Sequence, residues 1–197
     1  MHVYIIFCHP SRQSFTYSVL YSFTAGLKKS GHTYEIGDLY AMDFQTDMEP
    51  EQYNRESGTE PELSVPEDVA AEQAKIDKSD ALVFIYPVWW SDCPAKLKGW
   101  FDRVWTVGYA YSYENREHSA SRIKIKKALA LCPAGHPVEY LEAIGIAGSM
   151  RKIMLDDRLR GVGIKNAGME ILGGMISQDP DIRDSNLSRA YDLGQSF

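Results

Sequence analysis

Residues 9–16, which read HPSRQSFT, combine an imidazole, a guanidinium and several hydroxyls at the start of a helical pattern. Backbone N–H groups and the dipole at the N-terminus of a helix favour an anion, such as a phosphate group. The alternative is that Ser11 and Ser14 only cap the helix and that Arg12 is a solvated charge. The segment contains no G-x-G-x-x-G, so the common dinucleotide fingerprint is absent.

Two tryptophans, Trp89 and Trp90, follow shortly after an apolar run over 81–86. Such a run is typical of a strand that is buried on both faces, and Pro87 marks its end. In an open α/β sheet, ligands bind at the loops that leave the carboxyl ends of the strands. Flat apolar area in such a loop suits a planar ring system. The alternative is that both tryptophans are ordinary core or subunit-interface residues.

A third loop, PAGHP over 133–137, follows another apolar run over 123–132. The three loops together suit a flavin, with its phosphate at the first loop and its isoalloxazine ring against Trp89 and Trp90. The backbone of 134–136 would then face the pyrimidine edge of the ring. Hydride transfer places negative charge on that edge, so N–H dipoles there would stabilise the reduced flavin.

Other site chemistries find little support in the spacing of residues. Cys8, Cys93 and Cys132 are far apart and have no CxxC spacing, and the five histidines are scattered. This pattern predicts reduced cysteines and no metal site. No paired carboxylates or Ser–His–Asp set compete for the three loops.

Strand and helix patterns alternate along the chain. Strands are predicted over 3–7, 33–40, 81–86, 123–132 and 169–176. Helices are predicted from the first loop to Gly31, from a capping box at 64–67 to about 78, and over 95–105, 150–159 and 182–193. Residues 41–63 are expected to form a long loop, and 106–122 an excursion from the core. The alternation predicts an α/β, flavodoxin-like, doubly wound parallel sheet of order 2-1-3-4-5 with helices on both faces.

The 197 residues, 44% of them hydrophobic, suit a single domain over 1–197. The net charge of −6 argues against a nucleic-acid partner or an anionic membrane surface. No apolar run approaches the roughly 20 residues that span a bilayer. The first residues lack the basic and small-residue features of a signal peptide, so we expect a cytoplasmic protein without membrane insertion.

Six strings of the sequence occur together, and in the same order, in one known family. They are HPSRQSFT (9–16), DLYAMDF (38–44), VAAEQ (69–73), PVWW (87–90), PAKLKGWFDRV (94–104) and YAYSY (109–113). The chain resembles the NAD(P)H:quinone oxidoreductases, or DT-diaphorases, and in particular their short bacterial members.

The resemblance implies a flavodoxin-like homodimer with one flavin per subunit, FAD with FMN as the alternative. NADH or NADPH would give a hydride to the flavin, and a quinone or similar acceptor would take it in a ping-pong, two-electron reaction. The implied cofactor-binding residues are His9, Gln13, Ser14, Phe15, Thr16, Pro87, Val88, Trp89, Trp90, Pro133, Ala134, Gly135 and Tyr140. The implied catalytic residues are Tyr140, His136 and Trp90, and the implied substrate pocket consists of Trp90 with Tyr111 and Tyr113 of the neighbouring subunit.

The chain departs from the family pattern inside the expected site. The histidine that pairs with the family's tyrosine falls at Ala147 or a neighbour, so His136 could supply an imidazole from another place. Trp89 replaces a glutamine and Ser91 a phenylalanine, which alters the acceptor pocket. The alternative function is a flavin-binding regulatory subunit or electron carrier without significant turnover. The sequence identifies neither the natural acceptor nor the preferred nicotinamide.

Overall fold

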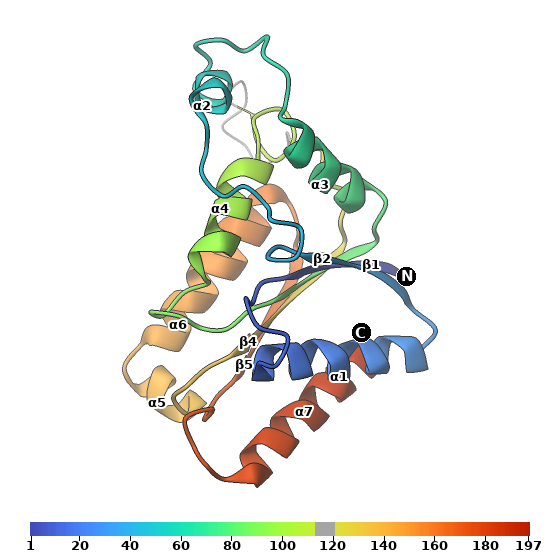
Figure 1. The fold of residues 1–197 in the computed structure, drawn as a ribbon, viewed down its shortest axis with the longest axis vertical. Helices are drawn as coiled ribbons and strands as arrows, with labels where there is room; N and C mark the ends of the chain where they lie inside the picture. The colour runs from blue at the N-terminus through green and yellow to red at the C-terminus, as the bar shows by residue number, and fades with distance from the viewer. Residues whose placement is uncertain (113–120) are drawn as a thin grey trace.

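The structure, a computed structural model, describes residues 1–112 and 121–197. Its centre is one parallel sheet of five strands in the order β2-β1-β3-β4-β5 (Figure 1). The strands are β1 (His2–Phe7), β2 (Thr33–Asp38), β3 (Ala81–Ile85), β4 (Lys127–Pro133) and β5 (Asn166–Leu172). The strand order reverses at β1, between β2 and β3, so the predicted fold class and order are confirmed.

Helices cover both faces of the sheet. The helical elements are α1 (Phe15–Lys29), α2 (Pro50–Glu56), α3 (Glu67–Asp77), α4 (Ala95–Val104), α5 (Val138–Ala143), α6 (Ile146–Arg151), the π-helical η2 (Lys152–Leu159), the 3₁₀ turn η3 (Arg160–Val162) and α7 (Pro180–Gln195). Helices α1 and α7 lie together on one face, and α4 with α6 and η2 lies on the other (Figure 1). Such coverage follows from the crossovers that parallel strands require.

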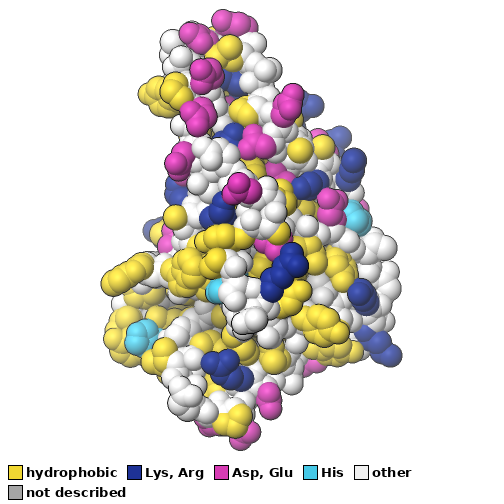
Figure 2. All heavy atoms as spheres, viewed as in Figure 1, with side chains coloured by type: hydrophobic (Ala, Val, Ile, Leu, Met, Phe, Trp, Pro, Cys, Tyr) yellow, Lys and Arg dark blue, Asp and Glu magenta, His cyan; other side chains and the backbone are white. Residues whose placement is uncertain are grey.

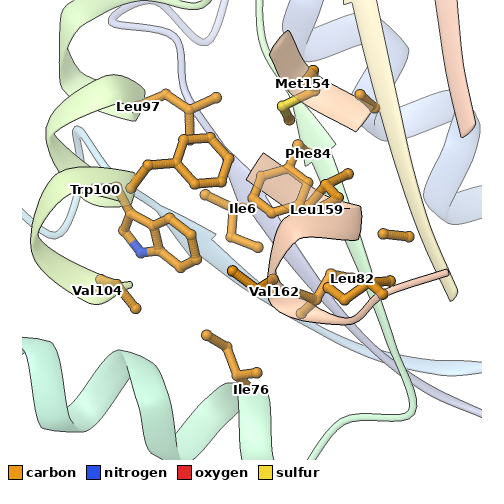
Figure 3. Close-up of a cluster of buried hydrophobic side chains, with 14 of the residues drawn as sticks. Ile6, Ile76, Leu82, Phe84, Leu97, Trp100, Val104, Met154, Leu159 and Val162 are labelled. Carbon is orange, nitrogen blue, oxygen red and sulfur yellow. The ribbon is translucent and has the colours of Figure 1, made fainter. Parts of the chain in front are cut away.

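Alternate residues of the strands supply the two halves of the core. Val3 and Ile5 of β1 pack with α1 and α7, whereas Ile6 packs with α4 and η2. In the second half, Trp100 of α4 lies beside strand and η2 side chains that include Phe84 and Leu159 (Figure 3). This side-chain period of two fixes which helix covers which face.

A buried carboxylate lies at the edge of this second half. Glu72 has no exposed surface and accepts hydrogen bonds from Tyr4 Oη at 2.6 Å and Trp100 Nε1 at 2.7 Å. Lys75 Nζ lies 2.6 Å from its other oxygen. Three donors offset the cost of burying the charge, so α3, β1 and α4 are held in one arrangement.

The polar tail forms α7 and packs closely on α1. A Cβ atom at Gly26 would lie 2.2 Å from the Tyr191 carbonyl oxygen, and one at Gly194 would lie 2.1 Å from the Phe23 carbonyl oxygen. The backbones of the two helices therefore touch at glycines. The predicted helix over 182–193 is confirmed and extends by two residues at each end.

Several predicted boundaries are wrong, each for a local reason. The expected loop over 41–63 contains α2, which begins at Pro50. The capping box does not form, because Pro66 occupies the cap position and no side chain caps α3. Ile123 and Ile125 are buried before the strand, which starts at Lys127.

The last third of the fold also departs from expectation. The predicted helix over 150–159 starts earlier, as α6, and continues as π-helix; α5 was not predicted; and the last strand covers 166–172 rather than 169–176. Within the described ranges, the structure has no helix that is both long enough and apolar enough to cross a membrane.

Candidate functional site

The carboxyl ends of β1, β3 and β4 lie side by side and bring the three predicted loops together. Backbone hydrogen bonds continue past the strands: Cys8 N–H donates to the Ile85 carbonyl oxygen at 3.0 Å, and Val88 N–H to that of Pro133 at 2.8 Å. The loops are thus fixed relative to one another by the sheet itself. This edge is the switch point of the topology, where α/β proteins bind ligands.

A cavity of about 430 Å³ opens between the second and third loops. It is lined by Val88, Trp90, Ser91, Ala134, Gly135, His136, Tyr140, Leu141, Ile144 and Ile146. Its size is within the range of small-molecule sites. Hydrophobic side chains gather on this part of the surface, where α5 and the ends of β4 and β5 lie (Figure 2).

The cavity unites some predicted residues with others that the sequence did not single out. Six predicted residues line it, namely Val88, Trp90, Ala134, Gly135, His136 and Tyr140. Leu141, Ile144 and Ile146 were missed, because they lie on α5 and at the start of α6, in a region where no helix was predicted. The Ile144 side chain is 51% exposed at the rim of the cavity, and the residues next to it in sequence give no indication of this exposed apolar surface.

Trp90 stands on a tight and strained turn. The Trp89 and Asp92 backbones exchange hydrogen bonds of 3.0 and 3.2 Å, and the two residues between them, Trp90 and Ser91, have φ angles of +50° and +67°. Two left-handed residues are typical of a type I′ turn, which usually contains asparagine and glycine. Non-glycine residues there cost on the order of 1–3 kcal/mol each, and such strain is concentrated at functional sites.

Neither tryptophan is a core residue. The Trp90 side chain is fully exposed, at 101%, and Trp89 is 41% exposed. The Trp89 ring meets the His9 ring edge-on, with centroids 5.9 Å apart. The interpretation of these residues as ordinary core is therefore excluded in this chain, and flat aromatic area is presented beside the cavity.

The third loop presents backbone donors to the cavity. The carbonyl oxygens of this loop accept hydrogen bonds from the 174–176 segment. Met175 N–H donates to the Ala134 carbonyl oxygen at 3.0 Å, and Ile176 N–H donates to that of Gly135 at 3.2 Å. Among the described residues, the N–H groups of Gly135 and His136 have no acceptor. Paired carbonyls and unpaired N–H groups form an edge that can bind a ligand's oxygen or nitrogen acceptors.

His136 and Tyr140 lie together at this edge. Their ring centroids are 4.9 Å apart with the planes tilted by 44°, and both side chains are exposed. Ala147, near the position of the family's histidine, is completely buried and cannot face a ligand. The imidazole that lies beside Tyr140 is that of His136, in the loop after β4, and its replacement of the family's histidine stays a prediction.

The first loop combines the two alternatives that the sequence offered, a serine that caps the helix and N–H groups that could bind an anion. Ser14 caps α1, with its Oγ accepting from Tyr17 N–H at 3.1 Å. The N–H groups of Phe15 and Thr16 in the first turn have no intrahelical acceptor, and this turn has no acidic residue. Capping by Ser14 thus leaves donors for an anion.

The charged groups around this helix start have distinct environments. Burial lowers the pKa of His9 below its ordinary value, which favours the neutral ring. Arg12 remains largely exposed, 3.7 Å from Asp38. The first loop therefore has an uncharged imidazole and a weakly paired cation near the N-terminus of α1.

The tyrosine-rich segment divides into residues with different environments. Tyr109 is buried and its hydroxyl donates to Asp77 Oδ1 at 3.0 Å, which is a structural role. Tyr111 is 37% exposed and is not among the residues that line the cavity of its own chain. Tyr113 lies outside the described residues. The role of these two tyrosines in a neighbouring subunit stays a prediction.

The three cysteines are free and buried. Burial raises the pKa of the Cys8 and Cys93 thiols to about 12, so both stay protonated at neutral pH. In the part of the chain that the structure describes, no group of three or more His, Cys, Asp and Glu residues could hold a metal ion.

The cavity, its donor edge and the helix start together fit a flavin. The cavity has aromatic and aliphatic walls for a ring, the edge has N–H donors for the ring's polar atoms, and the start of α1 has N–H donors for a phosphate. A dry, mostly apolar wall with a few fixed donors is what such a ligand requires.

Comparison with known proteins places the chain among proteins of related fold. The profile of a family described as "Flavodoxin-like fold" matches residues 1–193. A solved structure, the NAD(P)H:quinone oxidoreductase from Methanothermobacter marburgensis, is 57% identical with a TM-score of 0.93, covering 100% of this chain and 95% of that one.

Curated relatives are similar at lower identity. An uncharacterized NAD(P)H oxidoreductase of Haemophilus influenzae is 30% identical in an alignment that covers 100% of this chain and 95% of that protein. NAD(P)H dehydrogenase [quinone] 1 of Cavia porcellus is 30% identical over 93% of this chain and 72% of that protein. The ribosyldihydronicotinamide dehydrogenase-like protein traD of Penicillium crustosum is 30% identical over 78% of this chain, and the match spans 65% of its length.

Proposed function

The chain belongs to the family of flavodoxin-like NAD(P)H:quinone oxidoreductases, and from this premise we propose that it is a flavin-dependent NAD(P)H:quinone oxidoreductase. The observation that carries the proposal is the cavity in which the exposed Trp90 and the free N–H groups of Gly135 and His136 meet. When bound, a flavin supplies a ring that accepts a hydride from NADH or NADPH and passes it to a quinone-like acceptor.

The residues of the cavity bind and orient the ring. Trp90 and Val88 supply apolar walls, while the N–H groups of Gly135 and His136 donate to its polar edge. Donors that are fixed before the reaction stabilise negative charge as it develops, without reorganising. The hydrogen bonds that the N–H groups of 174–176 donate to the carbonyl oxygens of 134–136 hold the third loop in place. The N–H donors of Gly135 and His136 are therefore fixed by the fold.

Tyr140 and His136 are the proposed catalytic residues with Trp90. Both side chains end at the donor edge, where the Tyr140 hydroxyl can donate a hydrogen bond and the His136 imidazole can hold a proton. The open cavity gives the nicotinamide and the acceptor access to the same face in turn, which is the ping-pong order.

The phosphate end is proposed at the start of α1. Gln13, Ser14, Phe15 and Thr16 surround the first-turn N–H groups, with His9 beside them. We propose FAD rather than FMN, because the first loop is family-like and because the segment 38–48 corresponds to one that lies near the adenine end of the cofactor in the family. FMN remains the alternative cofactor.

The proposal includes an assembly and a location. A homodimer would let Tyr111 and Tyr113 complete the acceptor pocket of the neighbouring subunit. The single domain over 1–197 would then operate as a cytoplasmic enzyme. The rival function is a flavin-binding regulatory subunit or electron carrier; a carrier requires only an exposed ring edge, whereas the cavity beside Trp90 favours turnover.

Two measurements test the proposal. The purified protein should be yellow and release FAD on denaturation, as identified by chromatography. In stopped-flow experiments, NADH or NADPH should reduce the bound flavin, and mixing with benzoquinone should then reoxidise it within one turnover. A colourless protein that takes up neither flavin would refute the proposal, and reduction without multiple turnovers would favour the carrier.

A matched pair of variants tests the donor edge. Tyr140→Phe removes one hydroxyl at the cavity and should slow reduction of the flavin about tenfold or more, as for loss of a positioned donor. Tyr53→Phe removes an exposed hydroxyl on the distant α2 and should leave the rate unchanged. Equal rates for the two variants would remove Tyr140 from the catalytic set.

A further inference from the structure

An ion pair between the buried Arg158 and the half-buried Asp92 lies at the end of the strained turn that presents Trp90. The Asp92 carboxylate receives two parallel hydrogen bonds from Arg158, Nη1 to Oδ1 at 2.9 Å and Nη2 to Oδ2 at 2.9 Å. Its Oδ1 also accepts from Cys93 N–H at 2.7 Å. A fork-on-fork pair of this kind fixes direction as well as distance.

Arg158 is packed against residues of α4 and of the loop that precedes it. Its side chain is only 8% exposed, and its guanidinium lies over the Phe101 ring, 5.3 Å from the centroid. Nη1 lies 3.4 Å from Cys93 Sγ, and the Arg158 carbonyl oxygen accepts from Trp105 Nε1 at 3.0 Å. These contacts join Arg158 of η2 to Phe101 of α4, to Trp105 at the end of α4 and to Cys93.

Asp92 is the carboxylate that neutralises Arg158. Among the described residues, it is the ion-pair partner of Arg158. Burial by itself would raise the pKa of Asp92, but the hydrogen bonds from Arg158 and Cys93 lower it below its usual value, so the carboxylate stays charged. A buried charge that lost this partner would be strongly unfavourable, which makes the pair a stringent constraint on the turn.

The constraint has a direct consequence for Trp90. Two consecutive left-handed residues without glycine persist only when the surroundings determine them. The turn's own backbone bonds join Trp89 to Asp92, and Asp92 in turn is bound to Arg158. The π-helical segment that carries Arg158 is a kind of distortion that recurs at functional sites.

We propose that Arg158 and Asp92 are positioning residues, which hold the strained turn so that Trp90 stands as a wall of the ring-binding cavity. The inference rests on the proposed function for the identity of the ligand. It extends that function by adding a residue of η2, 68 positions from Trp90 in sequence, to the machinery that orients the flavin.

The first experiment tests the pair without any ligand. The apoprotein is labelled with 5-fluorotryptophan, and the ¹⁹F resonance of Trp90 is assigned by its loss in Trp90→Phe. We expect one sharp resonance in the wild type and a shifted or split resonance in Asp92→Asn and Arg158→Lys. Arg160→Met is the matched control: it removes an exposed ion pair with Asp156 and a hydrogen bond to the Ala167 carbonyl oxygen, neither of which involves residues 89–92, so it should leave the resonance unchanged.

The second experiment measures flavin affinity by titrating the same apoproteins with FAD and with FMN. We expect a Kd at least tenfold weaker in Asp92→Asn, an intermediate Kd in Arg158→Lys, and a Kd within twofold of wild type in Arg160→Met. The double variant Asp92→Asn with Arg158→Lys should bind flavin no more weakly than Asp92→Asn alone, because the pair acts as one unit.

A third variant separates positioning from simple stability. Adding Ser91→Gly to Asp92→Asn removes the strain of a non-glycine residue in the left-handed conformation at position 91. The added substitution should therefore raise the melting temperature towards that of the wild type without restoring flavin affinity. Unchanged resonance and Kd in folded Asp92→Asn and Arg158→Lys would overturn the inference, as would a changed resonance with an unchanged Kd. Failure of the wild-type protein to bind flavin would instead refute the proposed function. The ¹⁹F result would still test whether Arg158 and Asp92 position Trp90.

Discussion

Replacement of Trp90 by alanine should weaken flavin binding by roughly two orders of magnitude. The side chain is fully exposed in the ligand-free protein, so one whole face is available to a ring. An indole face presents about 100 Å², which at about 25 cal/mol per Å² contributes about 2.5 kcal/mol. Aromatic stacking adds about 0.5–1.5 kcal/mol, and the total of about 3–4 kcal/mol corresponds to a change in Kd of roughly 100-fold or more.

The same substitution should hardly change stability. An exposed side chain loses no buried contacts, so the free energy of unfolding should stay within about 0.5 kcal/mol of wild type. Trp90→Gly should be more stable than Trp90→Ala by up to about 1 kcal/mol, because a left-handed residue without a Cβ is unstrained. Urea unfolding of the apoproteins and fluorescence titration with flavin measure the two quantities separately.

Trp89→Ala is the control for this reasoning. Trp89 is more than half buried and contacts the His9 ring, so its loss should cost about 1 kcal/mol of stability but less flavin affinity than the loss of Trp90. A Kd within twofold of wild type for Trp90→Ala would refute the placement of the ring against Trp90. A larger loss in Trp89→Ala would transfer that role to its neighbour.

Three further predictions concern other parts of the molecule. Glu72→Ala should lower the free energy of unfolding by about 3–5 kcal/mol in urea titrations, because it leaves the buried Tyr4 and Trp100 donors unpaired, and a loss below about 1 kcal/mol would contradict this account. Because burial lowers the pKa of His9, the unfolded chain takes up a proton before the folded chain does, so stability should fall as the pH drops below 6.5. His9→Gln should flatten that part of the pH profile, and an unchanged slope between pH 5 and 7 would count against the shift. Changing Tyr111 and Tyr113 together to alanine should raise the acceptor KM severalfold at unchanged flavin content, whereas wild-type kinetics would exclude the shared pocket.

The strands and most helices could be predicted from local patterns. Continuous apolar runs identify β1 and β3, because strands buried on both faces need apolar residues at every position. Ser14 and Gly31 correctly bracket α1, since a cap and a left-handed glycine are local requirements of the backbone. The alternation of these elements predicted a parallel, doubly wound sheet, and the chain length then favoured the flavodoxin-like order that the structure has.

Local patterns misled where a neighbour in space decided the outcome. The expected capping box at 64–67 fails because Pro66 occupies the cap position, while Asp68 in the following turn forms an ion pair with Arg103. Ile123 and Ile125 were predicted as strand residues because they are apolar, but they are buried by packing in the core rather than by pairing in the sheet. Burial alone does not distinguish these two situations.

Six residue strings along the chain identified the family from the sequence alone, and six of the residues that line the cavity were predicted at the same stage. Tertiary structure decided how those residues act. The Ile144 wall of the cavity, the hydrogen bond from Ile176 N–H to the Gly135 carbonyl oxygen, and the pairing of Arg158 with Asp92 were all decided by packing rather than by local sequence. Hydrophobic periodicity and helix capping depend on residues that are close in sequence, so they can be predicted from the sequence. Ion pairs and hydrogen bonds between loops form only once packing has brought distant segments of the chain together.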